Sequence, residues 1–149
     1  MKRRFTKYPS NYIGAASETS GAAKRRKKRE FEQKAREGAE LLATDGEWEL
    51  WTPHNYEASI YISRMGIGND YTNRPRWDTA HEGDDHYFNY FNDRGPLYIF
   101  VNTANPAEKY QSHPASKLWF VDINDHVYDE QALIDFLDEH PTFSEFFDI

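Results

Sequence analysis

Two histidines and two aspartates lie within six residues of the chain, at His81, Asp84, Asp85 and His86. Imidazole and carboxylate groups bind divalent metals, so this cluster is the first candidate for metal-dependent chemistry. Its spacing matches no familiar metal motif, and a His- and Asp-rich loop before a helix more commonly supplies a helix cap and a solvated surface. We therefore predict no metal and no cofactor, and a small metal-dependent enzyme using His81 and His86 remains an alternative.

Other residue patterns that carry catalysis are missing from the sequence. The chain has no cysteine, which excludes a thiolate nucleophile, a disulfide framework and a cysteine-bearing zinc site. A glycine-rich phosphate loop, a nucleophile-elbow serine and an HExxH segment are also missing. Asp122 and Asp125 flank Asn124 as in a calcium loop, but the required glycine and terminal glutamate are not there. His113 and His126 lie beside predicted strands, and we predict no catalytic residue and a protein that is not an enzyme.

A run of six basic residues is the most cationic part of the chain. Ten lysines and arginines lie between positions 2 and 29, and Glu18 is the one acidic residue among them. This density would neutralise phosphates of RNA or DNA, while Phe5, Tyr8 and Tyr12 would stack on unpaired bases. The alternative is a solubilising tail or a charged helix face. We predict an RNA-binding or partner-binding arm that uses Lys24, Arg25, Arg26, Lys27, Lys28 and Arg29.

The charges of the chain are divided sharply along its length. Residues 1–37 hold 12 Lys and Arg against 4 Glu, whereas residues 38–149 hold 6 Lys and Arg against 21 Asp and Glu. Oppositely charged segments of one small protein attract and orient charged macromolecules over a Debye length of ~8–10 Å. The leading class is therefore a protein that binds charged macromolecular partners.

The end of the chain carries the densest negative charge. Residues 127–149 contain seven carboxylates and no Lys or Arg. Ordinary solubility explains such a composition without any partner. A sharper hypothesis is nucleic-acid mimicry, in which carboxylates on a rigid surface imitate a row of phosphates and enter a groove lined with Arg and Lys. On that hypothesis the acidic partner-binding face consists of Asp129, Glu130, Asp135, Asp138 and Glu139.

Length and local composition divide the chain into an arm, a helix and one domain. With 149 residues, 38% of them hydrophobic, the chain can bury one proper core. Residues 1–22 contain few large apolar side chains, which predicts a flexible basic arm. Apolar residues recur at helical spacing in residues 23–45, which predicts a basic amphipathic helix ending before Gly46. Residues 46–149 predict an acidic α+β domain.

The first elements of that domain follow from short local patterns. Trp48 and Leu50 alternate with polar residues, as in a strand with one buried face. Thr52 followed by Pro53 is typical of a helix start, and it predicts a helix over residues 54–65.

A second short helix is predicted after the His- and Asp-rich loop. Asp84 or Asp85 is expected to cap it, and Gly95 lies just beyond its end near residue 93. Three aromatic residues are expected to pack inward from this helix: Tyr87, Phe88 and Phe91.

The last part of the domain predicts a sheet and a final helix. Strands are predicted at residues 97–102, 109–113 and 118–123, and the short links between them favour an antiparallel meander. Asp129 is expected to open a helix that Pro141 ends. We predict a small antiparallel sheet of three to four strands with flanking helices, and therefore the α+β class.

Four short segments after Trp48 carry a likeness to a known domain: Arg76-Trp77-Asp78-Thr79-Ala80, Tyr87-Phe88-Asn89-Tyr90-Phe91, Gly95-Pro96-Leu97-Tyr98-Ile99 and Lys109-Tyr110-Gln111. With these segments, the chain from Trp48 to the end resembles a domain found in small phage and prophage proteins of unassigned activity. The resemblance covers about two thirds of the chain. The domain pattern has Cys where this chain has Asp78, so thiol chemistry at that position would be lost here.

A basic arm with Tyr and Ser ahead of a compact acidic domain also resembles the phage-encoded type II-A anti-CRISPR proteins in size, charge and layout. This resemblance implies a viral protein that inhibits a Cas9-type effector. Such effectors hold guide RNA and target DNA in positively charged channels and read the PAM with arginines. An acidic domain would occlude those sites sterically, while a basic arm would grip the guide RNA or the effector.

A rival hypothesis is a phage nucleic-acid-binding accessory protein, in which the basic arm is primary and the acidic domain is a solubilising scaffold.

The sequence has no run of the ~20 apolar residues that a membrane span requires, and no apolar signal segment follows the basic N-terminus. We therefore expect no membrane partner and a location in the host bacterial cytoplasm.

Overall fold

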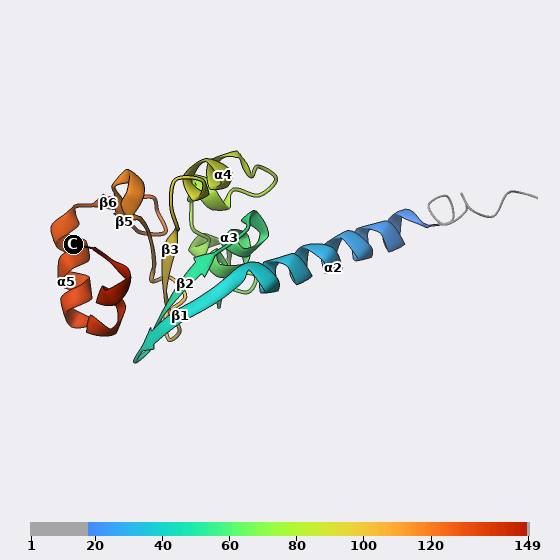
Figure 1. Ribbon diagram of the computed structural model, residues 1–149. Helices are drawn as coiled ribbons and strands as arrows, with labels where there is room; N and C mark the ends of the chain where they lie inside the picture. Colours follow the sequence, from blue (N-terminus) through green and yellow to red (C-terminus); the bar gives the residue numbers. More distant parts are fainter. Residues whose placement is uncertain (1–17, 149) are drawn as a thin grey trace, which may run out of the picture. The chain divides into compact units, whose positions relative to one another are not determined.

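A computed structural model describes residues 18–148 of the chain. Most of the predicted flexible arm, residues 1–17, lies outside the described residues. The chain divides into two compact units, one ending at Glu32 and the other beginning at Gln33. Figure 1 follows the helices and strands through the chain.

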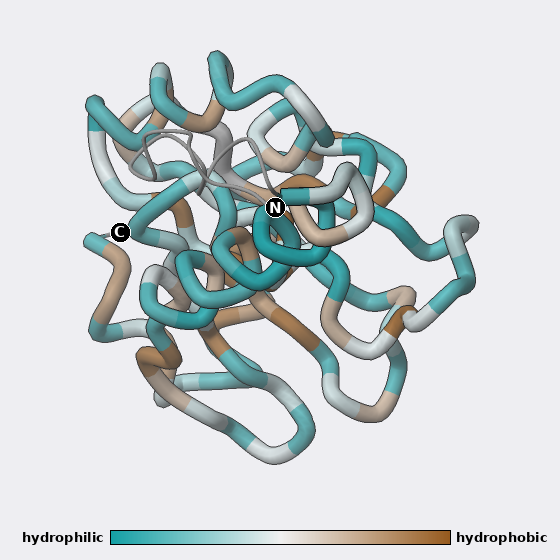
Figure 2. Tube along the Cα trace, turned by 90° about the vertical axis from the view of Figure 1, so that its right-hand side faces the viewer, coloured by the Kyte–Doolittle hydropathy of each residue, from teal (hydrophilic) through white to brown (hydrophobic). Residues whose placement is uncertain are grey.

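The first unit is described from Glu18 and contains the first turns of helix α2, Ser20–Gly38. Thr19 precedes this helix, and its Oγ1 accepts a hydrogen bond from the N–H of Ala22 at 3.0 Å. This cap starts the helix before residue 23, where the sequence predicted its beginning. Figure 2 shows α2 as a mostly hydrophilic helix, as its basic composition requires.

The prediction of one helix over residues 23–45 is wrong for its last seven residues. The helix α2 ends at Gly38, and residues Ala39–Asp45 form strand β1. This strand pairs antiparallel with β2, Trp48–Pro53, through a hairpin that turns at Gly46 with a φ of 61°.

Burial explains why residues 39–45 prefer the strand. Leu42 and Ala43 pack against the hydrophobic cluster that contains Leu50 and Phe100. The helical spacing of the apolar residues in this segment is a local preference, and pairing with β2 outweighs it. The register shifts between Leu41 and Ala43, which places an irregularity in β1.

The second unit is built on one six-stranded antiparallel sheet in the order β1 to β6, so each strand lies beside its sequence neighbours (Figure 1). The predicted α+β class and antiparallel meander are confirmed. The sheet has six strands instead of three to four, because β1 was predicted as helix and β6, with only two residues, carries no periodic signal. The remaining strands are β3 (Tyr98–Asn102), β4 (Lys109–His113), β5 (Leu118–Val121) and β6 (Val127–Tyr128).

Three further α-helices and four short 3-10 helices accompany the sheet in the described residues. The helix over part of 54–65, the helix before residue 93 and the final helix were all predicted. The α-helices are α3 (Tyr56–Ser63), α4 (His86–Asn92) and α5 (Glu130–Glu139). The 3-10 helices are η2 (Tyr71–Asn73), η3 (Asp78–Ala80), η4 (Pro114–Ser116) and η5 (Pro141–Phe146).

The predicted helix start at Thr52 and Pro53 is wrong. Both residues belong to β2, and Thr52 Oγ1 donates a hydrogen bond to the carbonyl of Leu97 at 2.7 Å. The N-cap of α3 is Asn55, whose Oδ1 accepts from the N–H of Ala58 at 2.8 Å. A Thr-Pro pair is compatible with both a helix start and a strand end, and the hydrogen bond to Leu97 decides for the strand.

The two faces of the sheet bury different side chains. Along β3, Phe100 belongs to one hydrophobic cluster, whereas Ile99 and Val101 belong to the other, as the alternation of a strand requires. The first cluster includes Leu133 and Leu137 of α5 and two phenylalanines of the chain end. The second includes residues of α3 and Trp77. Each fully buried large side chain contributes roughly 1.5–3 kcal/mol, so both helical layers are required.

The inward packing predicted for α4 is correct for Phe88 and wrong for Tyr87. Phe88 is buried, whereas Tyr87 is 44% exposed and its ring contacts His86 edge to face. Neighbouring residues of a helix are rotated by about 100°, so Tyr87 and Phe88 cannot share the buried side of so short a helix. Asp84 and Asp85 stand at its start as predicted, and Asp84 Oδ1 accepts from the N–H of His86 at 3.0 Å.

We predict that Gly38→Ala destabilises the fold. The added Cβ would lie 2.4 Å from Nδ2 of Asn55, the residue that caps α3 and donates to the carbonyl of Lys34 at 2.9 Å. Displacing Asn55 is expected to lower the free energy of unfolding by about 1–3 kcal/mol, measured by urea denaturation with tryptophan fluorescence. The control is Gly21→Ala, where the added Cβ meets only the tip of the Arg25 side chain at 3.4 Å. Equal unfolding midpoints for the two variants would contradict the prediction.

Candidate functional site

Helix α5 displays the predicted acidic residues on the surface of the second unit. All five carboxylates are exposed, and none forms an ion pair within residues 18–148. Three of them lie on the side of the helix opposite to the buried Leu133 and Leu137, because each residue advances by about 100°. These three residues form what we call the acidic patch: Asp135, Asp138 and Glu139.

The other two predicted members serve the start of the helix. Asp129 is the N-cap of α5, and its Oδ1 accepts a hydrogen bond from the N–H of Ala132 at 3.0 Å. Glu130 occupies the first turn, where the helix dipole favours a negative charge. The predicted face of five residues is therefore reduced to a patch of three. Within it, Gln131 Nε2 donates to Asp135 Oδ1 at 2.9 Å and orients that carboxylate.

Exposed apolar side chains immediately precede the acidic helix. Val127 is 60% exposed and Tyr128 is 38% exposed on the short strand β6. The Tyr128 hydroxyl donates to Asp122 Oδ2 at 3.0 Å, and this hydrogen bond raises the pKa of the phenol, so it remains a donor. The ring of His126 stacks on Tyr128 with an interplanar angle of 14°. Tyr is among the residue types enriched at the centres of protein interfaces, so Tyr128 is a candidate contact residue.

The basic residues 24–29 all lie on α2, in the first unit. Arg26 differs from the other five because its Nε and Nη2 donate to both carboxylate oxygens of Glu18 at 3.0 Å, and it also pairs with Glu30. The hydrogen bond from Arg26 lowers the pKa of Glu18. The remaining five are exposed and form no ion pair among the described residues, so they are the candidates for phosphate contact: Lys24, Arg25, Lys27, Lys28 and Arg29.

The structure does not bring the His- and Asp-rich loop together as a metal site. Within residues 18–148, no three His, Asp or Glu side chains are grouped closely enough to hold a metal ion. His81 Nδ1 lies 3.1 Å from the carbonyl of Glu82, and His86 packs on Tyr87. Asp84 holds the start of α4. His81, Asp84 and His86 therefore each make a contact within the loop and the start of α4.

The acidic turn at residues 122–125 uses its carboxylate internally. Asp122 Oδ1 accepts hydrogen bonds from the N–H of Asn124 at 2.9 Å and of His126 at 3.0 Å. Asp125 has a φ of 65°, and burial together with the nearby charges of Asp78 and Asp122 raises the pKa of its carboxyl group. The turn therefore leads from β5 into β6. Asp78, where the resembling domain has Cys, is exposed at the start of η3.

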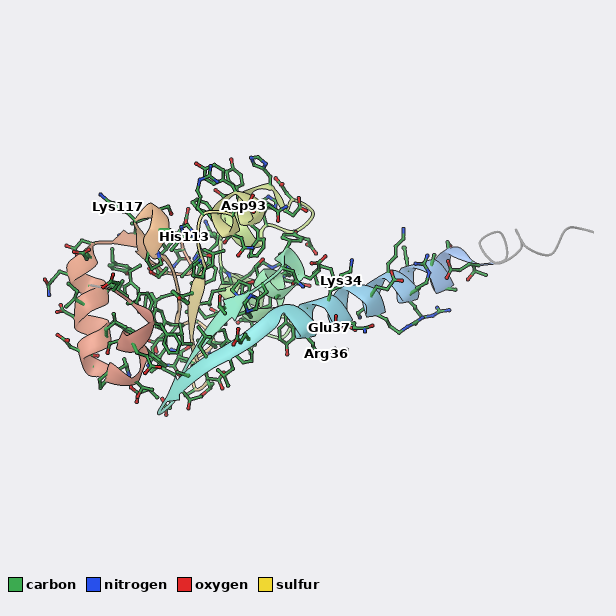
Figure 3. The ribbon with its side chains drawn as sticks, viewed as in Figure 1. Lys34, Arg36, Glu37, Asp93, His113 and Lys117 are labelled. Carbon is green, nitrogen blue, oxygen red and sulfur yellow. The ribbon has the colours of Figure 1, made fainter. Side chains whose placement is uncertain are left out.

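His113 is a buried structural residue at the end of β4 (Figure 3). Its Nε2 lies 2.8 Å from the carbonyl of Phe91 and 3.0 Å from that of Gly95, so this nitrogen carries a hydrogen and donates. Its Nδ1 is hydrogen-bonded to the hydroxyl of Ser116. His113 thereby links the end of α4 to the sheet, and its ring nitrogens are engaged in these contacts.

Two cavities of the second unit involve residues that sequence reasoning did not single out. One of about 460 Å³ is lined by Arg64, Arg74 and Arg76, and the other, of about 330 Å³, is lined in part by Lys109. Lys109 is fully buried in β4 and donates from Nζ to the carbonyl of Pro106 at 2.7 Å. The three arginines are spread over thirteen residues of sequence, and folding brings them to the same cavity.

Comparison of the chain with protein families, with curated proteins and with solved structures finds no match. Among the described residues, no helix has the length and apolar character needed to cross a membrane. The function must therefore be inferred from the surfaces and cavities of this chain alone.

We predict that Lys109 makes the stability depend on pH in the alkaline range. Burial lowers the pKa of Lys109 from 10.5 to about 8, so the unfolded chain binds more protons between these two values. The free energy of unfolding contributed by this group therefore rises as the pH increases from about 8 to 10.5 and is lost as the pH falls back through that window. Urea denaturation of wild type and Lys109→Met across this range should show a difference that grows in favour of the wild type.

The matched control is Lys34→Met, because Lys34 is exposed on α2 (Figure 3). Its stability should follow the wild type in parallel at every pH. A Lys109→Met curve that also runs parallel to the wild type would show that burial does not perturb the lysine.

Proposed function

We propose that this protein is an inhibitor that binds a nucleic-acid-handling enzyme and sterically blocks its engagement with nucleic acid. The observation that carries the proposal is the acidic patch, three exposed carboxylates on one side of α5 without an ion-pair partner in the described residues. The resemblance in layout to phage-encoded anti-CRISPR proteins makes a Cas9-type effector the partner to test. Inhibition would then take place in the cytoplasm of the infected bacterium.

The charge density of α5 supports mimicry of a nucleic acid. The three carboxylates of the acidic patch lie within residues 135–139, which rise about 6 Å along the helix axis. Duplex DNA carries one phosphate per ~3.4 Å along each strand, so the spacing of the patch is comparable with that of a phosphate row. A groove lined with Arg and Lys that accepts one would attract the other.

The rigidity of α5 gives these charges fixed positions. Leu133 and Leu137 are buried against the sheet, Asp129 caps the first turn, and Phe136 packs on Phe100 with ring centroids 4.8 Å apart. A carboxylate on such a helix loses little freedom on binding, in contrast to one on a flexible tail. This preorganisation favours specific docking over general solubility.

A second function is favoured by α2. Five exposed basic residues occupy its first turns, where they raise the electrostatic potential at the helix N-terminus. We infer that this segment contacts guide RNA or another nucleic acid by phosphate neutralisation. In the rival hypothesis of a nucleic-acid-binding accessory protein, this contact alone would account for the function.

Reversing charge in the acidic patch should weaken binding to the effector. In Asp138→Lys, Glu139→Lys the two lysines lie near the C-terminal end of α5, where the helix dipole favours positive charge, so folding should be preserved. We expect the Kd for a type II-A Cas9, measured by biolayer interferometry with and without guide RNA, to rise ~10-fold or more.

The matched control is Asp85→Lys, Asp93→Lys, which changes the net charge by the same amount at two exposed sites that flank α4. Its affinity should stay close to that of the wild type. If the two double variants lost affinity equally, the effect would come from net charge and the acidic patch would not be the binding surface. Failure of the wild-type protein to bind Cas9 in either state would reject this effector as the partner.

Neutralising the basic helix should reduce the salt dependence of RNA binding. Each phosphate contact contributes a slope of ~0.7 in a plot of log K against log salt for a single strand, so Lys24→Gln, Lys27→Gln, Lys28→Gln should lower the slope by about 2. Fluorescence anisotropy with a labelled RNA at several salt concentrations measures this change. Arg26→Gln serves as the control, because Arg26 already pairs with Glu18 and Glu30. A slope that is the same in the triple variant and the wild type would remove α2 from the interface.

A further inference from the structure

A cationic cavity of about 460 Å³ lies in the second unit, and none of its lining residues belongs to α2 or α5. Its walls come from the end of α3, from the segment containing η2 and from the residues on both sides of η3. Three arginines, two aromatic residues and one carboxylate supply its chemistry: Arg64, Arg74, Arg76, Tyr71, Trp77 and Glu82.

Two of these arginines have buried nitrogens without hydrogen-bond partners. In Arg64 they are Nε and Nη2, and in Arg74 the unpartnered nitrogen is Nε. A buried N–H group of a charged side chain that lacks an acceptor is costly, and native proteins rarely leave one unsatisfied. Guanidinium groups only donate, and the Arg64 and Arg74 side chains keep 27% and 32% of their surface exposed, so these N–H groups can be reached by an anionic oxygen or by water.

Glu82 neutralises this site only in part. Its Oε1 lies 3.8 Å from Arg64 Nη2 and 3.9 Å from Arg74 Nη1, which is within ion-pair range and beyond hydrogen-bond distance. The Glu82 side chain is 69% exposed, so it is free to swing away into solvent. With three arginines and one carboxylate, the lining carries a formal charge of about +2, which matches a dianion.

The cavity wall is held in place without the use of these charged groups. Trp77 is buried and donates from Nε1 to the carbonyl of Asp122 at 2.8 Å, and the N–H of Arg76 donates to the carbonyl of Ile123 at 2.9 Å. These two bonds tie the segment to the end of β5. Arg76 and the nearby Arg74 therefore extend from a segment anchored to the sheet, whereas Arg64 extends from the C-cap of α3.

We propose that this cavity binds a phosphate monoester carried by a nucleotide. A phosphate monoester is a dianion with several acceptor oxygens, and arginine forks bind such oxygens in bidentate fashion. The volume exceeds that of a bare phosphate and falls in the range of cavities that hold small organic ligands. Tyr71 is 65% exposed, and the guanidinium carbon of Arg74 lies over one face of its ring, 4.4 Å from the centroid, so the other face is the one we assign to the base.

The terminal phosphate has two sources with the same chemistry, a free nucleoside monophosphate and the 5′-phosphorylated end of a strand. Isothermal titration of the full chain with inorganic phosphate, adenosine monophosphate and adenosine tests the requirement for the phosphate. A pair of identical short oligonucleotides with 5′-phosphate and 5′-hydroxyl ends, titrated at raised salt to suppress contacts of α2, tests the strand end. Adenosine monophosphate should bind at least ~10-fold more tightly than adenosine. If the 5′-phosphorylated oligonucleotide binds more tightly than both its 5′-hydroxyl counterpart and adenosine monophosphate, the ligand is the strand end. If adenosine monophosphate binds more tightly than the 5′-phosphorylated oligonucleotide, the ligand is the free nucleotide.

Variants separate a binding site from a structural cluster. Arg64→Gln and Arg74→Gln should each weaken binding of adenosine monophosphate by ~10-fold or more. Glu82→Gln should tighten it several-fold, because the variant removes the internal competitor, and a gain of affinity cannot result from misfolding. Arg94→Gln is the matched control, since Arg94 packs over the ring of Tyr90 and does not line the cavity.

The proposal is overturned if neither phosphate nor adenosine monophosphate binds at millimolar concentration, or if adenosine binds as tightly as its monophosphate. It is also overturned if Glu82→Gln and Arg74→Gln both bind like the wild type. The residues tested here are separate from α2 and α5, so failure at the cavity leaves the proposed inhibition untouched, and failure of inhibition leaves the cavity untouched.

Discussion

The alternation of side chains along β3 is the constraint on which the rest of the fold depends. Phe100 points into one hydrophobic cluster while Ile99 and Val101 point into the other, so this one strand joins two cores. A sheet that is apolar on both faces requires cover on both, which α5 with η5 provides on one side and α3 with Trp77 on the other. The charged helix α5 is therefore held in position by its apolar side, and the location of its carboxylates follows from the burial of Leu133 and Leu137.

Elements with a strong local signal could be predicted from the sequence, and those that depend on distant partners could not. The apolar run that became β3 and the Asp129 cap of α5 both carry their cause within a few residues. Strand β1 does not, because Leu42 continues the helical spacing of Phe31, Ala35 and Ala39, and residues 39–45 become a strand only when β2 pairs with them. Thr52 has the sequence pattern of a helix start, but it lies in β2, where its hydroxyl donates to the carbonyl of Leu97, 45 residues away.

The candidate site shows the same division. The acidic and basic segments were visible as composition, but composition could not separate the side chains that face solvent from those that hold the backbone. Asp129 caps a helix, Asp122 closes a turn and Arg26 is paired with Glu18, so each is engaged inside the molecule. The arginine-lined cavity gave no signal in the sequence, because Arg64 and Arg74 are ten residues apart and meet only through the path of the chain after α3.

The register shift between Leu41 and Ala43 affects how another molecule could pair with the edge of this sheet. Within the part of the chain that the structure describes, β1 is one edge strand of the sheet and has seven residues, whereas the other edge strand, β6, has two. A regular edge strand of that length would be a template for a strand of another molecule. A bulge in the edge strand interrupts the backbone pairing that the second strand could form. An added strand therefore could not continue its pairing without interruption along all seven residues of β1.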